Sequence, residues 1–214
     1  MKIHKSLRND NALSGQSQLI GLLNNELPLI KKMEQLRDSL SFVKLIPNGE
    51  NILIRLLIEG LGLKIYFPRT GDNSERFDAT IDFIKYKAVA EIEIPSNEIL
   101  DAPRNLLDDY VVLKCRKKSN DTEIVPLVIC WDLPNKRTDY WNVITDIHNV
   151  LDIKIKTISI LALALHYWLN ESLSLENDDY FLDYTNSSMK HAINLLKKAD
   201  LSESNFPGYF TPFK

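Results

Sequence analysis

Three carboxylates lie close together in the sequence, at positions that two neighbouring strands could bring together. The stretch 77–95 alternates apolar and polar residues with period two, which predicts two strands joined by a tight turn near residues 86–87. Residues two apart on a strand point to the same face, so Glu91 and Glu93 share a face. In an antiparallel hairpin, Asp82 can then lie opposite or diagonal to them.

Carboxylates that converge inside an apolar frame repel one another, and a protein tolerates this mainly when a hard cation sits among them. The hairpin is therefore a candidate metal site. Asp78 precedes Asp82 by four residues and lies on the same face, either as a second acid or as an ordinary residue at the start of a strand. The alternative for the whole hairpin is an exposed strand face that carries solvated acids.

The hairpin resembles the metal-dependent nuclease core known as PD-(D/E)XK. In that family an Asp on one strand is followed, after a short turn, by Glu-x-Lys on the next. Here Asp82 and, after eight intervening residues, Glu91-Ile92-Glu93 occupy those places. The Glu at the third position is similar to type II restriction endonucleases of the BamHI and BglII type, in which Glu-x-Glu or Glu-x-Gln stands there. The resemblance covers about Asn51–Trp131.

This resemblance implies a metal-dependent DNA endonuclease that hydrolyses phosphodiester bonds, most simply one of the type II restriction type. It implies that Mg²⁺ or Mn²⁺ is bound by Asp82, Glu91 and the backbone carbonyl of Ile92. Glu93, where the family more often has Lys, would hold a second metal ion or orient the attacking water as a base. The implied partner is double-stranded DNA, and symmetric cutting of two strands implies a homodimer.

Two other functions stay open. The chain could be another nuclease on this core, for DNA repair, recombination or phage defence. It could also be a catalytically silent domain that binds DNA or protein, since Glu93 replaces the usual Lys. In the family, the helix before the first strand often carries an acid that supports the metal site, and Glu59 or, second, Glu50 is the candidate here.

The periodicity of the chain predicts an α/β (α+β) fold with extra helices at both ends. Its order of helix, three strands, helix and strand is that of the family named above, and the resemblance implies a restriction-endonuclease-like core with a central mixed sheet flanked by helices. A rival for the second half of helix 104–117 is a strand that begins at Tyr110. The expected helices are 17–25, 28–40, 51–59, 104–117, 139–151, 157–170 and 187–199, and the strands outside the hairpin are 63–67, 124–131 and 153–156.

The predicted organisation is a single domain made of three segments. Residues 1–46 form an N-terminal helical extension, residues 47–170 form the nuclease-like core, and residues 171–214 hold a C-terminal helix and an aromatic tail packed on the core. Phe206, Tyr209, Phe210 and Phe213 lie in this tail. Four unburied aromatic rings would favour aggregation, so we expect the tail to dock on a partner or on its own core.

The net charge of −3 does not favour nucleic acid, so any basic surface must be built locally. A solvated helix end is the plain alternative for the cluster Lys114–Lys118, because cations suit the C-terminus of a helix. Lys136 and Arg137 form a second basic cluster. The candidate phosphate contacts are Lys85, Lys87, Arg69, Arg76, Lys117 and Lys118.

Other features bound the location of the protein. Cys115 and Cys130 have no metal-ligand spacing, which favours a reduced, cytoplasmic compartment. No signal peptide is visible at the N-terminus. The longest apolar run, 158–169, is too short to cross a bilayer, so no membrane association is expected.

Overall fold

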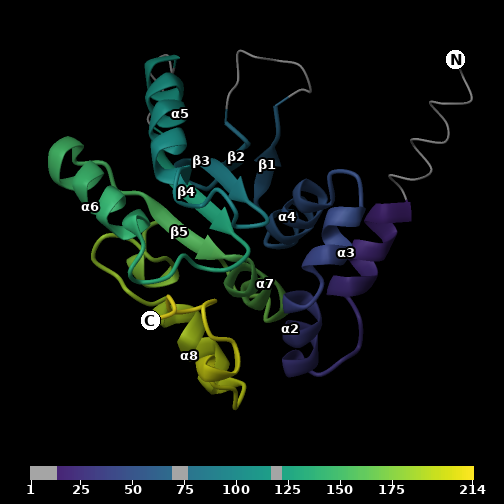
Figure 1. Ribbon diagram of the computed structural model, residues 1–214. Coiled ribbons are helices and arrows are strands. Elements are labelled where there is room, and N and C mark those ends of the chain that lie inside the picture. Colours follow the sequence, from purple (N-terminus) through teal and green to yellow (C-terminus); the bar gives the residue numbers. More distant parts are fainter. Residues whose placement is uncertain (1–13, 69–76, 117–121) are drawn as a thin grey trace, which may run out of the picture.

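A five-stranded mixed sheet forms the centre of the computed structural model, which describes residues 14–68, 77–116 and 122–214 (Figure 1). The strands lie in sequence order across the sheet. The first three are antiparallel to one another, and the last three are parallel. The strands are β1 (Lys64–Tyr66), β2 (Ala79–Asp82), β3 (Tyr86–Glu93), β4 (Glu123–Cys130) and β5 (Lys156–Ser159). The expected mixed sheet is confirmed.

Helices flank this sheet and precede and follow it in sequence. Residues 14–23 are helical. The α-helices after them are α2 (Leu29–Arg37), α3 (Leu40–Leu45), α4 (Gly49–Gly60), α5 (Ala102–Arg116), α6 (Asp139–Leu151), α7 (Ile160–Trp168) and α8 (Lys190–Lys198). The expected order of helix, three strands, helix and strand is therefore present from α4 to β4, and the rival strand from Tyr110 is not.

The helix expected from Pro28 through Leu40 is divided into α2 and α3. Pro28 stands immediately before the first turn of α2, where its missing N–H costs no hydrogen bond. The break falls at Ser39, whose hydroxyl donates to the carbonyl of Leu36 at 2.7 Å. Such local bonding between a serine side chain and the backbone competes with continued helix.

The helices cover the sheet from two sides. Figure 1 shows α5 and α6 on one side and α2, α3 and α4 on the other. α5 packs against β3 and β4, whereas α4 packs against β1 and α7. Buried apolar residues from Leu19 to Phe210 form one continuous cluster, so both ends of the described chain contribute to the same core. The boundaries proposed at residues 46 and 170 stay a prediction.

The turn of the hairpin lies at Phe83–Lys85 and not near residues 86–87. Asp82 pairs with Lys87, and the N–H of Phe83 donates to the carbonyl of Tyr86 at 2.8 Å. The reason is that β3 also pairs with β4, whose first residue, Glu123, lies beside Tyr86. Pairing with β4 holds residues 86 and 87 in extended conformation, so the chain must reverse before them.

The last strand also differs from its prediction. A strand at 153–156 was expected, but β5 begins at Lys156 and continues through Ser159. Thr157 and Ile158 pair with β4 instead of entering the next helix. α7 then begins at Ile160, because the Ser159 hydroxyl accepts a hydrogen bond from the N–H of Ala162 at 3.3 Å and caps the first turn.

The aromatic tail docks on the core of the same chain. Phe206 and Phe210 are buried. The N–H of Leu133 donates to the carbonyl of Gly208, and that of Lys136 donates to the carbonyl of Phe213, each at 2.8 Å. The tail therefore supports the loop that follows β4. No helix in the described ranges is long and apolar enough to cross a membrane.

Candidate functional site

Asp78, and not Asp82, is the acid that lies beside Glu91. Ala79 pairs with Ala90, so the next residue outward on each strand places Asp78 opposite Glu91. Carboxylate oxygen Oδ2 of Asp78 accepts a hydrogen bond from the N–H of Ile92 at 2.8 Å. This bond fixes the Asp78 side chain next to the Glu91-Ile92-Glu93 segment at the end of β3.

Glu91 and Glu93 share a face of β3, as the strand period predicted, and both are removed from solvent. The Glu93 residue is only 8% exposed, and Glu91 is partly buried. Asn105 of α5 donates from Nδ2 to Oε1 of Glu91 at 3.4 Å. α5 therefore packs over this face and removes water from carboxylates that would otherwise be solvated.

The pKa values of all three acids are raised, by burial first and, for the two glutamates, by the charge of Asp78 second. Burial, and after it the negative charge of Asp78, raise the pKa of Glu91 to about 7. Burial and Asp78 likewise raise the pKa of Glu93 to about 7, with smaller effects from Glu98 and Asp101. Burial also raises the pKa of Asp78, although the bond from the Ile92 N–H opposes that rise. The site therefore concentrates carboxylates that share one proton-binding environment.

The structure does not bring Asp82 together with Glu91 and Glu93. Asp82 forms an ion pair with Lys87, its partner across the hairpin. Lys87 stands four residues before Glu91, which is about 13 Å along a strand. Asp82 is on the same sheet face as Glu91, as expected, but at the other end of the hairpin.

Two candidate phosphate contacts have partners in the structure. Nζ of Lys85 lies 3.0 Å from a carboxylate oxygen of Glu176, and Lys87 is paired with Asp82. The supporting acid expected on the helix before β1 is not placed at the site: Glu59 is exposed on α4, and the acids that act on Glu91 and Glu93 come from other elements. Arg69, Arg76, Lys117 and Lys118 lie outside the described residues.

Two residues of α5 contribute to the candidate site although the sequence pattern predicted no role for them. Asn105 contacts Glu91, and the buried carboxylate of Asp109 is a further charge that raises the Glu91 pKa. The two lie four apart and so share a helix face. A polar pair at this spacing on a helix that packs against the carboxylate strand is a signal that could have identified them.

The chemistry of the donors suits a hard cation. The side chains of Asp78, Glu91 and Glu93 and the backbone carbonyl of Ile92 offer only oxygen, which Mg²⁺, Mn²⁺ and Ca²⁺ prefer. Within the ranges that the structure describes, no three His, Cys, Asp or Glu side chains are grouped to hold a metal ion as they stand. Binding an ion at this site would therefore require the glutamate side chains to rotate on the fixed backbone of β3.

A cleft lies at the carboxyl ends of the parallel strands β3 and β4, where its lining begins two residues after Glu93. It has a volume of about 500 Å³ and is lined by parts of the segments 95–100 and 132–138, together with Leu40 of α3. The hydroxyl of Ser96, in this lining, donates to the carbonyl of Glu93 at 3.4 Å and to that of Asp132 at 3.1 Å. The carboxyl ends of parallel strands are the usual place for ligands in open α/β sheets.

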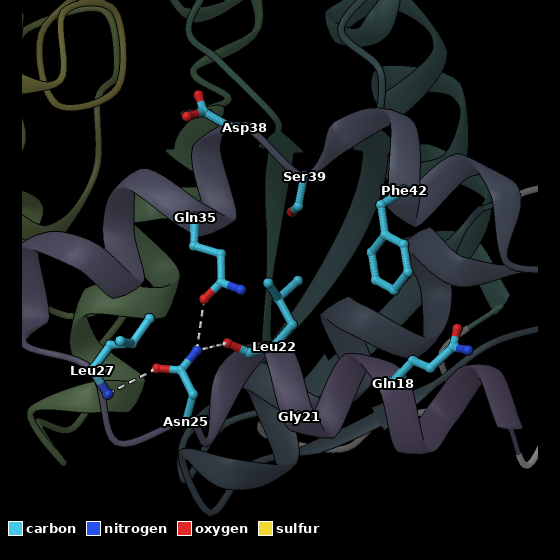
Figure 2. A pocket seen from close by; sticks show the side chains of 9 residues that line it. All are labelled: Gln18, Gly21, Leu22, Asn25, Leu27, Gln35, Asp38, Ser39 and Phe42. Carbon is cyan, nitrogen blue, oxygen red and sulfur yellow. Dashed lines mark hydrogen bonds between the residues drawn. The ribbon is translucent and has the colours of Figure 1, made fainter.

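A separate pocket lies among the N-terminal helices (Figure 2). It has a volume of about 750 Å³ between the helix at 14–23 and the α2–α3 segment. Asn25 lies at its edge, donating from Nδ2 to Gln35 Oε1 at 2.8 Å and to the carbonyl of Leu22 at 2.9 Å. Asp38 is the one ionisable side chain in its lining, and it is paired with the neighbouring Arg37. The pocket thus lacks the paired acids that the hairpin provides.

Comparison with known proteins adds a likeness of fold and nothing from sequence. No protein-family model matches the chain, and no curated protein matches it. The fold is similar to a solved structure of the restriction endonuclease FokI, with a TM-score of 0.48 and 14% sequence identity. The likeness covers 77% of this chain and 32% of that chain, so the chain spans about a third of that protein. At this similarity the likeness assigns no residue and no activity.

Replacing Glu91 by Gln should stabilise the metal-free protein above neutral pH. A carboxyl with a raised folded pKa binds protons more tightly in the folded state, so stability falls as pH rises from the ordinary 4.5 to about 7. At about 1.4 kcal/mol per pKa unit, ionising Glu91 costs roughly 3 kcal/mol. Urea unfolding at pH 5 and pH 8 should show Glu91→Gln gaining about 1–3 kcal/mol at pH 8 and little at pH 5. The exposed-acid control, Glu59→Gln, should show no such difference, and an equal gain at both pH values would contradict this account.

Divalent cations should release protons when they bind. Near pH 7, Glu91 and Glu93 are each partly protonated, and a cation selects the ionised form. Titration calorimetry with Mn²⁺ in two buffers of different ionisation enthalpy should give about one proton released at pH 6.5 and fewer at pH 8.5. Binding heats that do not depend on the buffer would mean that these carboxyls are not the ligands.

Proposed function

We propose that the chain is a metal-dependent endonuclease that hydrolyses phosphodiester bonds in double-stranded DNA, most simply an enzyme of the type II restriction type. The observation that carries the proposal is the placement of Asp78 against Glu91 and Glu93. These acids lie at the end of a mixed sheet; burial raises the pKa values of all three, and the charge of Asp78 raises those of both glutamates further. Desolvating like charges is costly, which favours a site that a cation completes.

Asp78, Glu91 and the carbonyl of Ile92 would hold the ion. When bound, a divalent ion supplies a water of lowered pKa and neutralises negative charge on the phosphate. Asn105 favours one orientation of the Glu91 carboxylate through its hydrogen bond. Asp78 is held toward the end of β3 by the Ile92 N–H, so two of the three ligands are positioned by the hairpin itself.

Glu93 would act as the base. A general base works best when its pKa is near the pH of the reaction, and the Glu93 pKa of about 7 meets this condition. It takes a proton from the attacking water, whose oxygen forms the new bond to phosphorus while the bond to the leaving oxygen breaks. Because Glu93 is mostly buried, the proton has few competing acceptors from bulk water.

A row of charges four residue pairs away from the carboxylates would contact the DNA backbone. Lys64, Asp82 and Lys87 pair across β1, β2 and β3 on the face that carries Glu91. The row holds two lysines and one acid, so it keeps one net positive charge. Asp82 thus acts in this proposal as the partner of Lys87 and not as a metal ligand. Phosphate contacts of this kind position the nucleic acid without reading its sequence.

A catalytically silent DNA-binding domain is the second candidate. It is favoured by the spacing of the carboxylates, because no three acidic, His or Cys side chains in the described residues are grouped around a common point. The presence of Glu93 where the related motif more often has Lys favours it too. The two candidates differ in one observable, the cutting of a plasmid in Mg²⁺.

Substitutions at Asp78 and Asp82 test which of the two aspartates acts together with Glu91. Asp78→Asn and Glu91→Gln should lower the cleavage rate in Mg²⁺ at least about 1,000-fold, because each removes a ligand charge. Both should keep or tighten DNA binding in Ca²⁺, since a carboxylate near the phosphate is lost. The matched control Asp82→Asn should cut within about threefold of wild type. Cleavage that is lost in Asp82→Asn but kept in Asp78→Asn would refute the assignment.

The proposed enzyme should be a homodimer when it cuts both strands. The described part of the chain provides one such carboxylate site, and symmetric cleavage of a duplex needs two. Light scattering at micromolar concentration, with and without duplex DNA in Ca²⁺, should give a mass near twice that of the 24.6 kDa chain in at least the DNA-bound state. A monomer in both states would instead indicate an enzyme that nicks one strand.

A further inference from the structure

We propose that the cleft at the carboxyl ends of β3 and β4 holds one nucleotide of the DNA strand, next to the carboxylates that act on its phosphate. This inference rests on the proposed nuclease function, because it identifies part of the same site. The cleft begins two residues after Glu93, and its volume of about 500 Å³ lies within the usual range for a small-molecule site.

The lining of the cleft suits a nucleobase better than a phosphate. Its apolar part includes Leu40, Ile99 and Leu133, which offer a surface for the face of a base. Its polar part includes the side chains of Asn97 and Asn135, whose amides both donate and accept hydrogen bonds. Asparagine is well matched to the edge of a base for this reason. An anion in the cleft would meet the carboxylate of Asp132, whereas a neutral base would not be repelled.

Basic side chains stand where the phosphates of such a nucleotide would lie. Lys136 and Arg137 directly follow Asn135, and both are exposed. With the base in the cleft, these cations would be available to its phosphate. Glu93 precedes Pro95, the first residue of the β3 side of the lining, by two positions.

The loop that forms one wall is held in place before any ligand arrives. The carbonyl of Asn135 accepts bonds from the hydroxyl of Thr138 at 2.7 Å and from the indole of Trp141 at 3.2 Å. The next N–H, of Lys136, donates to Phe213 of the tail at 2.8 Å. These bonds are made by the backbone of Asn135, so its side-chain amide remains available to bind a ligand. A wall of this kind loses little conformational entropy when a ligand binds.

The opposite wall is fixed in the same way. The hydroxyl of Ser96 donates to the carbonyl of Asp132 at 3.1 Å and accepts from its N–H at 3.3 Å, which ties the loop after β3 to the loop after β4. Both strand ends therefore form the cleft, their loops are hydrogen-bonded to each other, and Leu40 of α3 also lines it. A DNA strand bound there would lie beside α3.

Nuclear magnetic resonance titration without divalent metal tests the cleft directly. The probes are dAMP, dGMP, dCMP and dTMP, with 2-deoxyribose 5-phosphate and inorganic phosphate as ligands that lack the base. At least one nucleotide at up to about 10 mM should shift the backbone amides of Ser96, Asn97, Leu133 and Asn135, and should bind at least about fivefold tighter than deoxyribose phosphate. The variant Asn97→Ala/Asn135→Ala should weaken that binding about tenfold, because it removes the amides but not the backbone bonds of the loop.

The matched control is Asn149→Ala, at an exposed position on α6, which should bind as wild type does. Three results would overturn the inference: no shift at the cleft with any of the four nucleotides, equal binding of deoxyribose phosphate, or unchanged binding by the double variant. Cleavage is not a readout of this experiment, so the two ideas fail separately. A chain that cuts DNA in Mg²⁺ but shows no nucleotide shifts loses only the cleft. A chain that binds a nucleotide there but never cuts DNA loses only the nuclease activity.

Discussion

The pairing of β2 with β3 is the constraint on which the candidate site depends. Asp82 meets Lys87 at one end of this pair, and Asp78 meets Glu91 at the other. One end is thus a neutral ion pair beside a further lysine, and the other is a group of like charges. A different register would exchange these partners and place Asp82 at the carboxylates. The position of the turn therefore determines which charged residues meet at each end of the hairpin.

Packing then sets the energetics of the carboxylates. β3 is held between β2 and β4, and α5 covers the face that carries Glu91. Burial is for this reason the largest cause of the raised pKa values of Glu91 and Glu93, and charge repulsion comes second. The core does not merely support the site from a distance. It removes the water that would otherwise keep the pKa values of these acids in their usual range. The loss of that water favours the binding of a cation or a proton among them.

Much of the fold could be predicted from periodicity and turn residues, whereas the register of the hairpin could not. The order of elements from α4 to β4 and the bounds of α6 were expected. The period of two also placed Glu91 and Glu93 on one face. When the turn moves by two residues, each residue of β3 faces a partner four positions away on β2, and every side chain stays on the same face of the sheet. The alternation of apolar and polar residues is therefore the same whether Asp78 or Asp82 lies opposite Glu91. The deciding contact, between Tyr86 and Glu123 of β4, joins residues that are distant in the sequence. The same limit applies to Asn105 and to the cleft, which exist only once α5, β3 and β4 are packed.

Crystals grown with Mn²⁺ and measured at the manganese absorption edge would test the central claim most directly, because anomalous scattering locates the ion without assuming any activity. The account predicts a peak within about 2.5 Å of carboxylate oxygens from Asp78 and Glu91, with the Ile92 carbonyl or Glu93 completing the set. A peak on Asp82 would contradict it, and so would well-ordered Asp78, Glu91 and Glu93 side chains with no peak among them at saturating Mn²⁺.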